Sequence, residues 1–250
     1  MVKMKSWETK NGYKIVRMLA GRSNVFLVSH GGKNILVDSG PGSRWKTLDR
    51  RLRRLGVGRL DALVLTHAHY DHAGNAARLQ EKYEARVIAH IVEGPFLSKG
   101  ENNAVNGTHA LTRLMVAGLG KLFARRARYE PCRPDIQVDP AFDLREFGFK
   151  ANIPHTPGHT PGSLSVIVDD EIALVGDAMF GIFPWSVFPP YAVDAGDLVR
   201  SWGKLLATKC RLFLPAHGSA TTRRRVARDY DKRSARRGKG GCGGASKIDR

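Results

Sequence analysis

The residues best suited to chemistry lie in the stretch Thr66–Gly74, where three histidines and one aspartate occupy six consecutive positions. They are His67, His69, Asp71 and His72. Imidazole and carboxylate groups at this spacing are typical metal ligands, and they suit zinc as well as iron, manganese or nickel. His67 and His69 can point to one side of a turn, while Asp71 and His72 can face a second point. One stretch can therefore serve two cations.

The apolar run Leu60–Leu65 directly precedes these ligands and predicts a buried strand. The ligands would then lie where a strand gives way to a loop, which is where active sites collect. No cysteine lies nearby, and this excludes a cysteine-rich structural zinc site.

The remaining elements predict an α/β protein in which strands alternate with helices. Strands are expected at residues 14–19, 23–30, 33–37, 60–65, 86–89, 147–153, 163–168, 172–175 and 211–214. Helices are expected at residues 43–55, 71–83 and 198–207, and a basic helix from residue 221. An apolar stripe between Leu111 and Phe123 has helical spacing, which fits either a cap over a substrate site or core packing.

The composition is that of one main domain, residues 1–220, followed by a basic helix and a disordered Gly-rich tail, residues 221–250. No apolar run reaches the roughly 18 residues that span a bilayer, and the polar segment Met1–Lys10 lacks a secretory core. The three cysteines are widely spaced, which argues against a disulfide framework. We therefore expect a cytoplasmic protein.

The net charge of +18 is the unusual feature of the chain. Residues 223–250 hold eleven Lys and Arg against three Asp, and further basic clusters lie at residues 44–54 and 125–128. Such patches can bind nucleic acid or an anionic membrane, and they also occur as plain solvated surface. Stacking aromatic residues are not interleaved with these charges, which weakens the nucleic-acid interpretation.

Three later blocks each place a polar donor at the end of an apolar strand. The donors are His159 in residues 156–163, Asp177 in residues 175–178 and His217 in residues 214–218. Glycine and proline flank each donor and fix a tight backbone, which lets the side chain approach a shared centre. Each block alone is a weak signal, since a single His or Asp is common in turns and caps. Their joint occurrence with the first stretch is specific.

With these motifs the chain resembles the metallo-β-lactamase superfamily, from Asp38 through His217. The resemblance implies a four-layer αβ/βα sandwich over residues 1–220, in which two mixed β-sheets pack face to face between helices. The metals would lie in a groove at one edge of the sandwich.

The resemblance also implies the ligand set. His67, His69 and His159 would hold the first metal, Asp71, His72 and His217 the second, and Asp177 would bridge them. Asp38 would orient a ligand or a metal-bound water, as outer carboxylates do.

The implied activity is that of a binuclear metal-dependent hydrolase with two Zn²⁺ ions per chain, or Fe or Mn in their place. Such a pair makes a bridging hydroxide available at neutral pH and polarises the bond under attack, while Asp71 could shuttle the proton. The expected bond is an ester, thioester or lactone, as in the glyoxalase II-like and lactonase-like branches. Members that cleave lactams seldom carry a bridging aspartate, and flavin-partnered diiron members carry Glu where this chain has His69.

The loop after Asp177 gives the best indication of the substrate. Phe180, Phe183 and Trp185 crowd into it, and apolar walls suit a small acyl substrate. Tyr70, inside the metal motif, would either face the same pocket or simply support the turn. The alternative is that these aromatic side chains pack beneath a loop or at a homodimer contact.

Two other functions stay open at this point. The same metal site could serve a phosphodiesterase or nuclease that holds nucleic acid on the basic surface and tail, and its binding would weaken steeply with salt. The chain could also be an inactive protein that uses the basic surface for binding. A mononuclear-iron dioxygenase of the same fold is a minor alternative.

Overall fold

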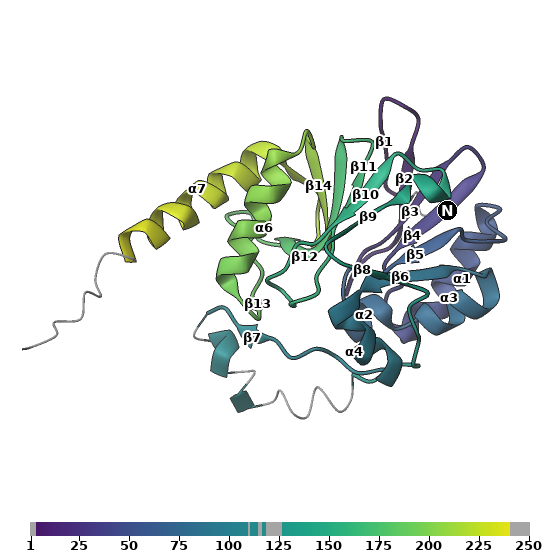
Figure 1. The fold of residues 1–250 in the computed structure, drawn as a ribbon, viewed down its shortest axis with the longest axis horizontal. Helices are drawn as coiled ribbons and strands as arrows, with labels where there is room; N and C mark the ends of the chain where they lie inside the picture. The colour runs from purple at the N-terminus through teal and green to yellow at the C-terminus, as the bar shows by residue number, and fades with distance from the viewer. Residues whose placement is uncertain (1–3, 110, 115–116, 119–126, 241–250) are drawn as a thin grey trace, which may run out of the picture.

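The computed structural model describes residues 4–109, 111–114, 117–118 and 127–240, and within them two large β-sheets pack face to face (Figure 1). The first sheet has seven strands in this spatial order: β1 (Ser6–Glu8), β2 (Lys14–Leu19), β3 (Val25–His30), β4 (Lys33–Val37), β5 (Ala62–Val64), β6 (Arg86–His90) and β8 (Ile136–Val138). Strands β1 to β4 are antiparallel, whereas β4, β5, β6 and β8 are parallel.

The second sheet is also mixed. Its described strands lie in the order β15 (Thr221–Thr222), β14 (Leu212–Gly218), β12 (Ile172–Gly181), β11 (Val166–Val168), β10 (Ala151–Pro154) and β9 (Ala141–Asp143). Strands β12 and β14 are parallel and the other neighbours are antiparallel. Two short strands, β7 (Asn106–Gly107) and β13 (Tyr191–Ala192), pair with each other instead of joining either sheet.

Helices cover the outer faces and complete the predicted four-layer sandwich (Figure 1). The α-helices described over their full length are α1 (Trp45–Arg54), α2 (Tyr70–Ala73), α3 (Ala76–Tyr83), α4 (Gly94–Lys99), α6 (Ala195–Ala207) and α7 (Arg223–Gly240). Single 3₁₀ turns are η1 (Gly42–Arg44), η2 (Ile91–Glu93) and η3 (Leu144–Phe147). Helices α1 and α3 lie against the first sheet and α6 against the second. No helix among the described residues is both long and apolar enough to cross a membrane.

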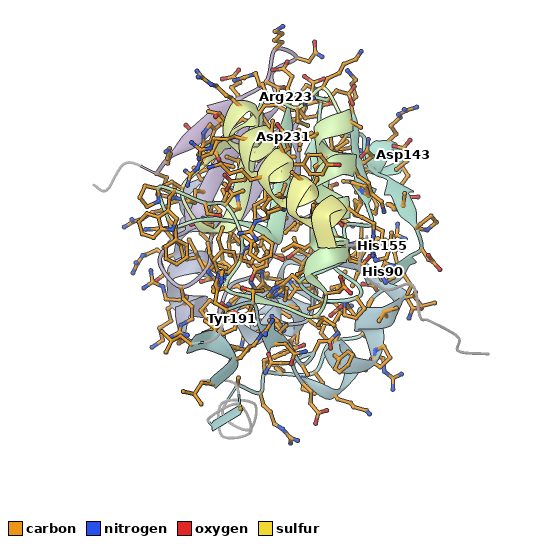
Figure 2. The ribbon with its side chains drawn as sticks, turned by 90° about the vertical axis from the view of Figure 1, so that its left-hand side faces the viewer. His90, Asp143, His155, Tyr191, Arg223 and Asp231 are labelled. Atoms are coloured by element: carbon orange, nitrogen blue, oxygen red, sulfur yellow. The ribbon has the colours of Figure 1, made fainter. Side chains whose placement is uncertain are left out.

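The basic helix expected from residue 221 is α7, and it packs on α6 (Figure 2). Its first residue, Arg223, donates hydrogen bonds to the carbonyl oxygens of Thr208 (2.8 Å) and Cys210 (3.2 Å) at the end of α6 and the loop that follows. Part of the positive charge of α7 therefore anchors the helix to the domain. The predicted Gly-rich tail at residues 241–250 lies outside the described residues.

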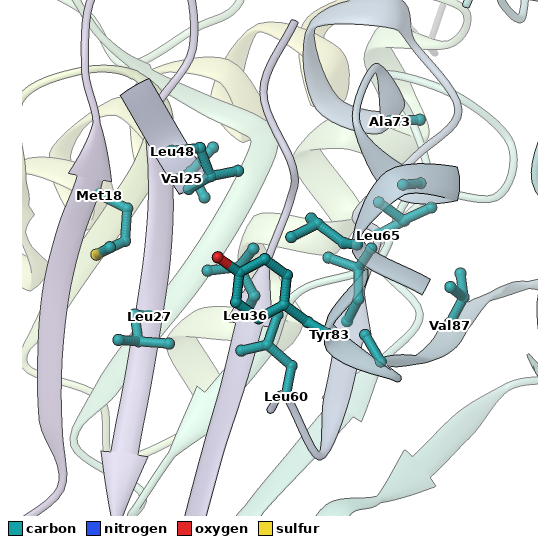
Figure 3. Packing of buried hydrophobic residues seen from close by; sticks show 14 of the residues in the cluster. Met18, Val25, Leu27, Leu36, Leu48, Leu60, Leu65, Ala73, Tyr83 and Val87 are labelled. Atoms are coloured by element: carbon teal, nitrogen blue, oxygen red, sulfur yellow. The ribbon is translucent and has the colours of Figure 1, made fainter. Parts of the chain in front are cut away.

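Strand alternation produces the layered core. On β4, Leu36 packs with the helices of the first outer layer, whereas Ile35 and Val37 face the second sheet, because successive side chains of a strand point to opposite faces. Figure 3 shows Leu36 among the apolar side chains that α1 contributes through Leu48 and α3 contributes through Tyr83. A third cluster, with Trp202 at its centre, joins the second sheet to α6.

Three of the expected boundaries differ most from the structure, each for a local reason. The helix expected at residues 71–83 is split into α2 and α3, because the amide group of Asn75 donates hydrogen bonds to the carbonyl oxygens of Ser39, Gly40 and Pro41. The strand expected from residue 147 begins at Ala151, after η3. The strand expected at residues 172–175 runs on to Gly181, because it pairs with β14 along that length.

Candidate metal centre

The donors predicted from the sequence meet at one edge of the sandwich. Asp38 directly follows β4 and the His67 stretch follows β5, and the carboxyl ends of these parallel strands lie at the same edge of the first sheet. Asp177 and His217 lie inside β12 and β14, which are parallel strands of the second sheet. The expectation that each donor would follow the end of its strand was therefore wrong for these two, since both strands continue past the donor.

The two sheets approach each other closely at this edge, where Gly176 lies against Thr66. Gly176 adopts a φ of +50°, and a Cβ atom at this position would lie 2.7 Å from Cβ of Thr66. A side chain at Gly176 would push β12 away from the loop that carries His67. Glycine here therefore lets Asp177 come close to histidines from the other sheet.

Three imidazoles form the first cluster. Nδ1 of His69 lies 2.8 Å from Nε2 of His67 and 3.2 Å from Nε2 of His159. These three nitrogen atoms could ligate one ion, since all lie within 4.8 Å of one another. His67 and His159 are buried and His69 is partly buried.

Hydrogen bonds on the far side of the rings orient this cluster. Nε2 of His69 donates to the carbonyl oxygen of Asn103 (2.9 Å), and Nδ1 of His159 donates to the carbonyl oxygen of Tyr191 (2.9 Å) in β13. A carbonyl oxygen only accepts, so each ring nitrogen facing it carries the proton. The opposite nitrogen of each neutral ring then presents a lone pair to the cluster, as in histidine metal ligands.

The second cluster contains Asp71, His72 and His217, whose ligand atoms again lie within 4.8 Å of one another. Nδ1 of His72 donates to Oδ2 of Asp38 (2.8 Å), so its Nε2 faces the cluster. Asp38 is itself held by the backbone N–H of Thr66, which donates to its Oδ1 over 2.8 Å. Asp38 therefore lies behind His72, and its role in orienting a ligand or a metal-bound water stays a prediction.

Asp177 lies between the two clusters. Its Oδ1 is 3.5 Å from Nε2 of His72 and 3.3 Å from Nε2 of His217, and its Oδ2 is 3.4 Å from Nε2 of His159. One carboxylate oxygen therefore faces each cluster. A third possible ligand group, His67 with His72 and Asp177, joins the two clusters.

The charges of the centre favour a cation. Burial alone would lower the pKa of His72, but Asp38, Asp177 and Asp71 raise it to about 10. Burial and the neighbouring imidazoles lower the pKa of His69 to about 4. Buried carboxylates this close together need a compensating positive charge, which either a proton on His72 or a metal ion can provide.

Two buried atoms without a hydrogen-bond partner show whether the residues fit a metal. Among the described residues, Nε2 of His72 and Oδ1 of Asp177 are buried and have no hydrogen-bond partner. They face each other, and burying two lone pairs in this way is costly unless something positive lies between them. Nitrogen and carboxylate oxygen donors of this kind suit zinc, iron and manganese. The residues therefore fit a metal.

The predicted substrate-pocket residues separate in the structure. Phe180 is buried, and its ring centre lies 4.5 Å from that of His217, beside the second cluster. Phe183 and Trp185 stack on each other, with ring centres 5.5 Å apart, and Trp185 is 70% exposed. Tyr70 instead accepts a hydrogen bond from Arg22. Phe180 thus lies beside the second cluster and Tyr70 contacts Arg22, and the assignment of these residues to a substrate pocket stays a prediction.

The apolar stripe between Leu111 and Phe123 is described only in part. Met115, Leu119, Leu122 and Phe123 lie outside the described residues. Leu111 and Leu114 are 69% and 71% exposed, so these two side chains do not belong to the core.

Sequence reasoning missed Glu93, a fully buried carboxylate in the turn after β6. Its Oε2 accepts from the backbone N–H of Ala68 (2.9 Å), and its Oε1 accepts from the hydroxyl of Thr160 (2.8 Å) and the N–H of Gly162 (3.1 Å). It thereby joins the loops that carry the histidines of the first cluster. One signal was available, because β6 is parallel to β5 and ends at the same edge of the sheet.

His90 and His155 also lie close together, outside both clusters (Figure 2). Their rings stack with centres 4.1 Å apart, and Nε2 of His155 donates to the carbonyl oxygen of Pro161 (2.7 Å).

A mixed αβ/βα sandwich with a His and Asp centre at its edge defines the class of protein. The family model described as the metallo-beta-lactamase superfamily matches residues 18–217, and the chain belongs to this superfamily.

Curated relatives share this region at low identity. The chain is 29% identical over 181 residues to the probable metallo-hydrolase MJ0888 of Methanocaldococcus jannaschii, a match covering 71% of this chain and 75% of the relative. It is 23% identical over 235 residues to the atrochrysone carboxyl ACP thioesterase of Aspergillus fumigatus, covering 89% of this chain and 62% of that one.

Solved structures show the same fold. The di-iron-bound form of TTHA1623 is similar with a TM-score of 0.61 and 26% identity, over 85% of this chain and 97% of that one. The BLEG-1 B3 metallo-beta-lactamase has a TM-score of 0.65 and 22% identity, over 88% and 96% of the two chains.

Proposed function

We propose that this chain is a binuclear, zinc-dependent hydrolase of an ester, thioester or lactone. The observation that carries the proposal is the overlap of three ligand groups, in which His67 and His72 each belong to two groups and Asp177 lies between the clusters. This arrangement suits two neighbouring cations. The metallo-hydrolase name of the relative from Methanocaldococcus jannaschii also supports hydrolysis.

His67, His69 and His159 would hold one ion, Asp71, His72 and His217 the other, and Asp177 would contribute one oxygen to each. When bound, such a pair supplies Lewis acidity and an activated water at neutral pH. The di-iron form of TTHA1623 makes iron the main alternative to zinc.

The protein's own side chains prepare the centre for this chemistry. Asp38 and the carbonyl oxygens of Asn103 and Tyr191 each accept a hydrogen bond from a ring N–H, which fixes the histidines with their opposite nitrogen atoms facing inward. Asp71 is partly buried at the rim of the centre, so it can accept the proton released as the bond is cleaved.

A small acyl group fits the surroundings best. Phe180 presents an apolar ring beside His217, and apolar walls with few polar groups suit an acyl chain. The relative from Aspergillus fumigatus is named as a thioesterase, which favours a thioester among the three bonds. We place the protein in the glyoxalase II-like and lactonase-like branch of the superfamily.

The described cysteines, Cys132 and Cys210, are buried and free, which suits a reducing cytoplasm.

The proposal is tested by metal quantification followed by a substrate panel. The purified chain should contain about two transition-metal ions, as binuclear hydrolases of this kind do. It should cleave acyl thioesters, esters or lactones in preference to bis(4-nitrophenyl) phosphate. Turnover of the phosphodiester alone, or of short nucleic acids with a steep salt dependence, would replace the proposal with a phosphodiesterase.

The His69→Ala variant is the control for the panel. It should lose both metal and turnover if the first cluster is the reaction centre. Full activity of this variant would refute the proposed function. The proposed function would also be refuted if the purified chain contained no transition metal and added zinc gave no turnover.

A further inference from the structure

Two neighbouring cavities lie beside the loop that carries the metal motif. The larger, of about 320 Å³, is lined by Pro41, Gly42, Ser43, Tyr70, Gly74, Arg78, Arg128, Tyr129 and Glu130. The smaller, of about 230 Å³, is lined by Leu19, Ala20, Gly21, Arg22, Ser23, Pro41, Ser43 and Arg44. Pro41 and Ser43 belong to both, so the two cavities adjoin.

Arginine is the charged residue that dominates these linings. Arg78 is paired with Glu130 (3.4 Å) and Arg128 with Glu101 (2.9 Å). Among the described residues, Arg22 and Arg44 have no carboxylate partner. Two positive charges in the smaller cavity are therefore uncompensated.

The arginines are connected to the candidate metal centre through the chain itself. Arg22 donates a hydrogen bond to the hydroxyl oxygen of Tyr70, which lies between His69 and Asp71 in the sequence. The hydroxyl of Ser23, the next residue, donates to the carbonyl oxygen of Asp71. Because the oxygen of Tyr70 accepts from Arg22, its own proton remains available to a ligand in the larger cavity.

We propose that these cavities bind an anionic group of the substrate, a phosphate or a carboxylate, through Arg22, Arg44 and the hydroxyl of Tyr70. Guanidinium groups bind both anions with paired, charge-assisted hydrogen bonds. The inference rests on the proposed function, since it assigns an anionic group to the substrate whose acyl bond lies at the metal centre. A phosphate would come from the leaving group of a thioester, and a carboxylate from its acyl part.

The test compares the double variant Arg22→Gln/Arg44→Gln with Arg50→Gln/Arg54→Gln. The control pair removes the same charge from exposed positions of α1 that line neither cavity. Three probes are used: octanoyl-coenzyme A with phosphates on the leaving group, glutaryl-N-acetylcysteamine with a carboxylate on the acyl group, and neutral octanoyl-N-acetylcysteamine. Binding of coenzyme A and of glutarate is measured separately by calorimetry on the full chain.

The quantity compared is the ratio of kcat/KM for an anionic thioester to kcat/KM for the neutral thioester. In the Arg22/Arg44 variant we expect this ratio to fall about tenfold or more for at least one anionic thioester, because charge-assisted hydrogen bonds are lost. The control pair should keep the wild-type ratio. A change with octanoyl-coenzyme A alone identifies phosphate as the anion, and a change with the glutaryl thioester alone identifies carboxylate.

Calorimetry separates this inference from the proposed function. If the wild type cleaves no thioester but binds coenzyme A or glutarate, and only the Arg22/Arg44 variant loses that binding, the anion site stands without the proposed activity. Equal ratios in wild type, test and control variants would overturn the inference. Wild-type protein that neither cleaves the anionic thioesters nor binds either anion would overturn it as well.

Discussion

The carboxylate of Glu93 and the hydroxyl of Thr160 lie 2.8 Å apart, in a hydrogen bond that joins the turn after β6 to the loop that carries His159. The other oxygen of Glu93 holds the backbone of Ala68, between His67 and His69. One buried carboxylate thus fixes both chain segments of the first cluster, and it acts on the centre through them.

The Glu93→Gln variant should therefore bind its first metal ion more weakly. Glutamine replaces one acceptor oxygen with an NH₂ group, which must then face the N–H of Ala68 or that of Gly162. Loss of an outer partner of this kind typically weakens metal affinity about 10- to 100-fold. Competition with a chelating dye measures the affinity, and the absorption bands of bound Co²⁺ report the geometry of the site.

Glu84→Gln is the matched control, because Glu84 is exposed and, within the described part of the chain, forms an ion pair only with Arg59. A folded Glu93→Gln protein with wild-type affinity and unchanged Co²⁺ bands would contradict the positioning role of Glu93. A change in melting temperature alone would mean that Glu93 serves only the fold.

Asp177→Asn should uncouple the two clusters. Asparagine keeps one carbonyl oxygen but loses the second acceptor and the negative charge, so it can serve one cluster only. We expect the metal content to fall from about two ions towards one, and kcat to fall at least about 100-fold, since outer groups alone cost 10- to 100-fold. Elemental analysis and steady-state kinetics measure both effects.

Asp170→Asn is the control for this change. Asp170 lies in the turn between β11 and β12 with a φ of +58°, a conformation that asparagine also adopts readily. If Asp177→Asn kept two ions and full turnover, the bridging position of Asp177 would have no functional meaning.

Metal removal should destabilise the fold. Without a metal ion, a proton on His72 must compensate the buried carboxylate of Asp177, and the other donor atoms of the two clusters lose their shared partner. Saturating Zn²⁺ should raise Tm by about 5–10 °C over the chelated protein, as expected for a ligand at roughly 100 times its Kd. Differential scanning calorimetry measures the shift, and Mg²⁺ is the control, because it prefers oxygen ligands and should not replace zinc. An unchanged Tm would mean that no ion binds the folded chain.

Much of this centre could be predicted because its ligands are local in sequence or lie in short motifs. Four ligands can be recognised because they lie within six consecutive positions: His67, His69, Asp71 and His72. Asp177 and His217 can be recognised by the glycine and apolar residues beside them. The family resemblance implied a bridging place for Asp177, whose oxygens lie 3.5 Å from Nε2 of His72 and 3.4 Å from Nε2 of His159, and the bridging role stays a prediction.

The residues that orient the ligands could not be predicted in the same way. Asn103 and Tyr191 act through backbone carbonyl oxygens, which leave no mark on side-chain type. Glu93 is a lone glutamate after a strand, and only the packing of two loops around it shows that it is buried. The split between α2 and α3 likewise depends on contacts of Asn75 with residues more than thirty positions away.

The last prediction concerns stability and pH, and it rests on Asp49 in α1. Its carboxylate accepts from Lys82 (2.5 Å) and from the hydroxyl of Tyr83 (2.8 Å), which ties α1 to α3 over the first core cluster. Partial burial opposes ionisation, but Lys82, Tyr83 and Arg53 outweigh it and lower the pKa of Asp49. A carboxyl group whose pKa is lower in the folded state stabilises the fold above its unfolded pKa of about 3.9, and this contribution is lost as the pH falls below it.

Asp49→Asn should therefore lower the free energy of unfolding at pH 7 by about 1 kcal/mol, a figure that allows for solvent screening of the half-exposed Lys82. The difference between variant and wild type should shrink below about pH 4, because Asp49 then binds a proton more readily in the unfolded wild-type chain, where its pKa is higher, than in the folded one. Urea unfolding at pH 7 and at pH 3.5 measures it. Asp61→Asn is the carboxylate control, since the side chain of Asp61 accepts a backbone N–H, that of Asn34, and has no charged partner among the described residues. A deficit of equal size at both pH values would show that packing, and not the charge of Asp49, joins the two helices.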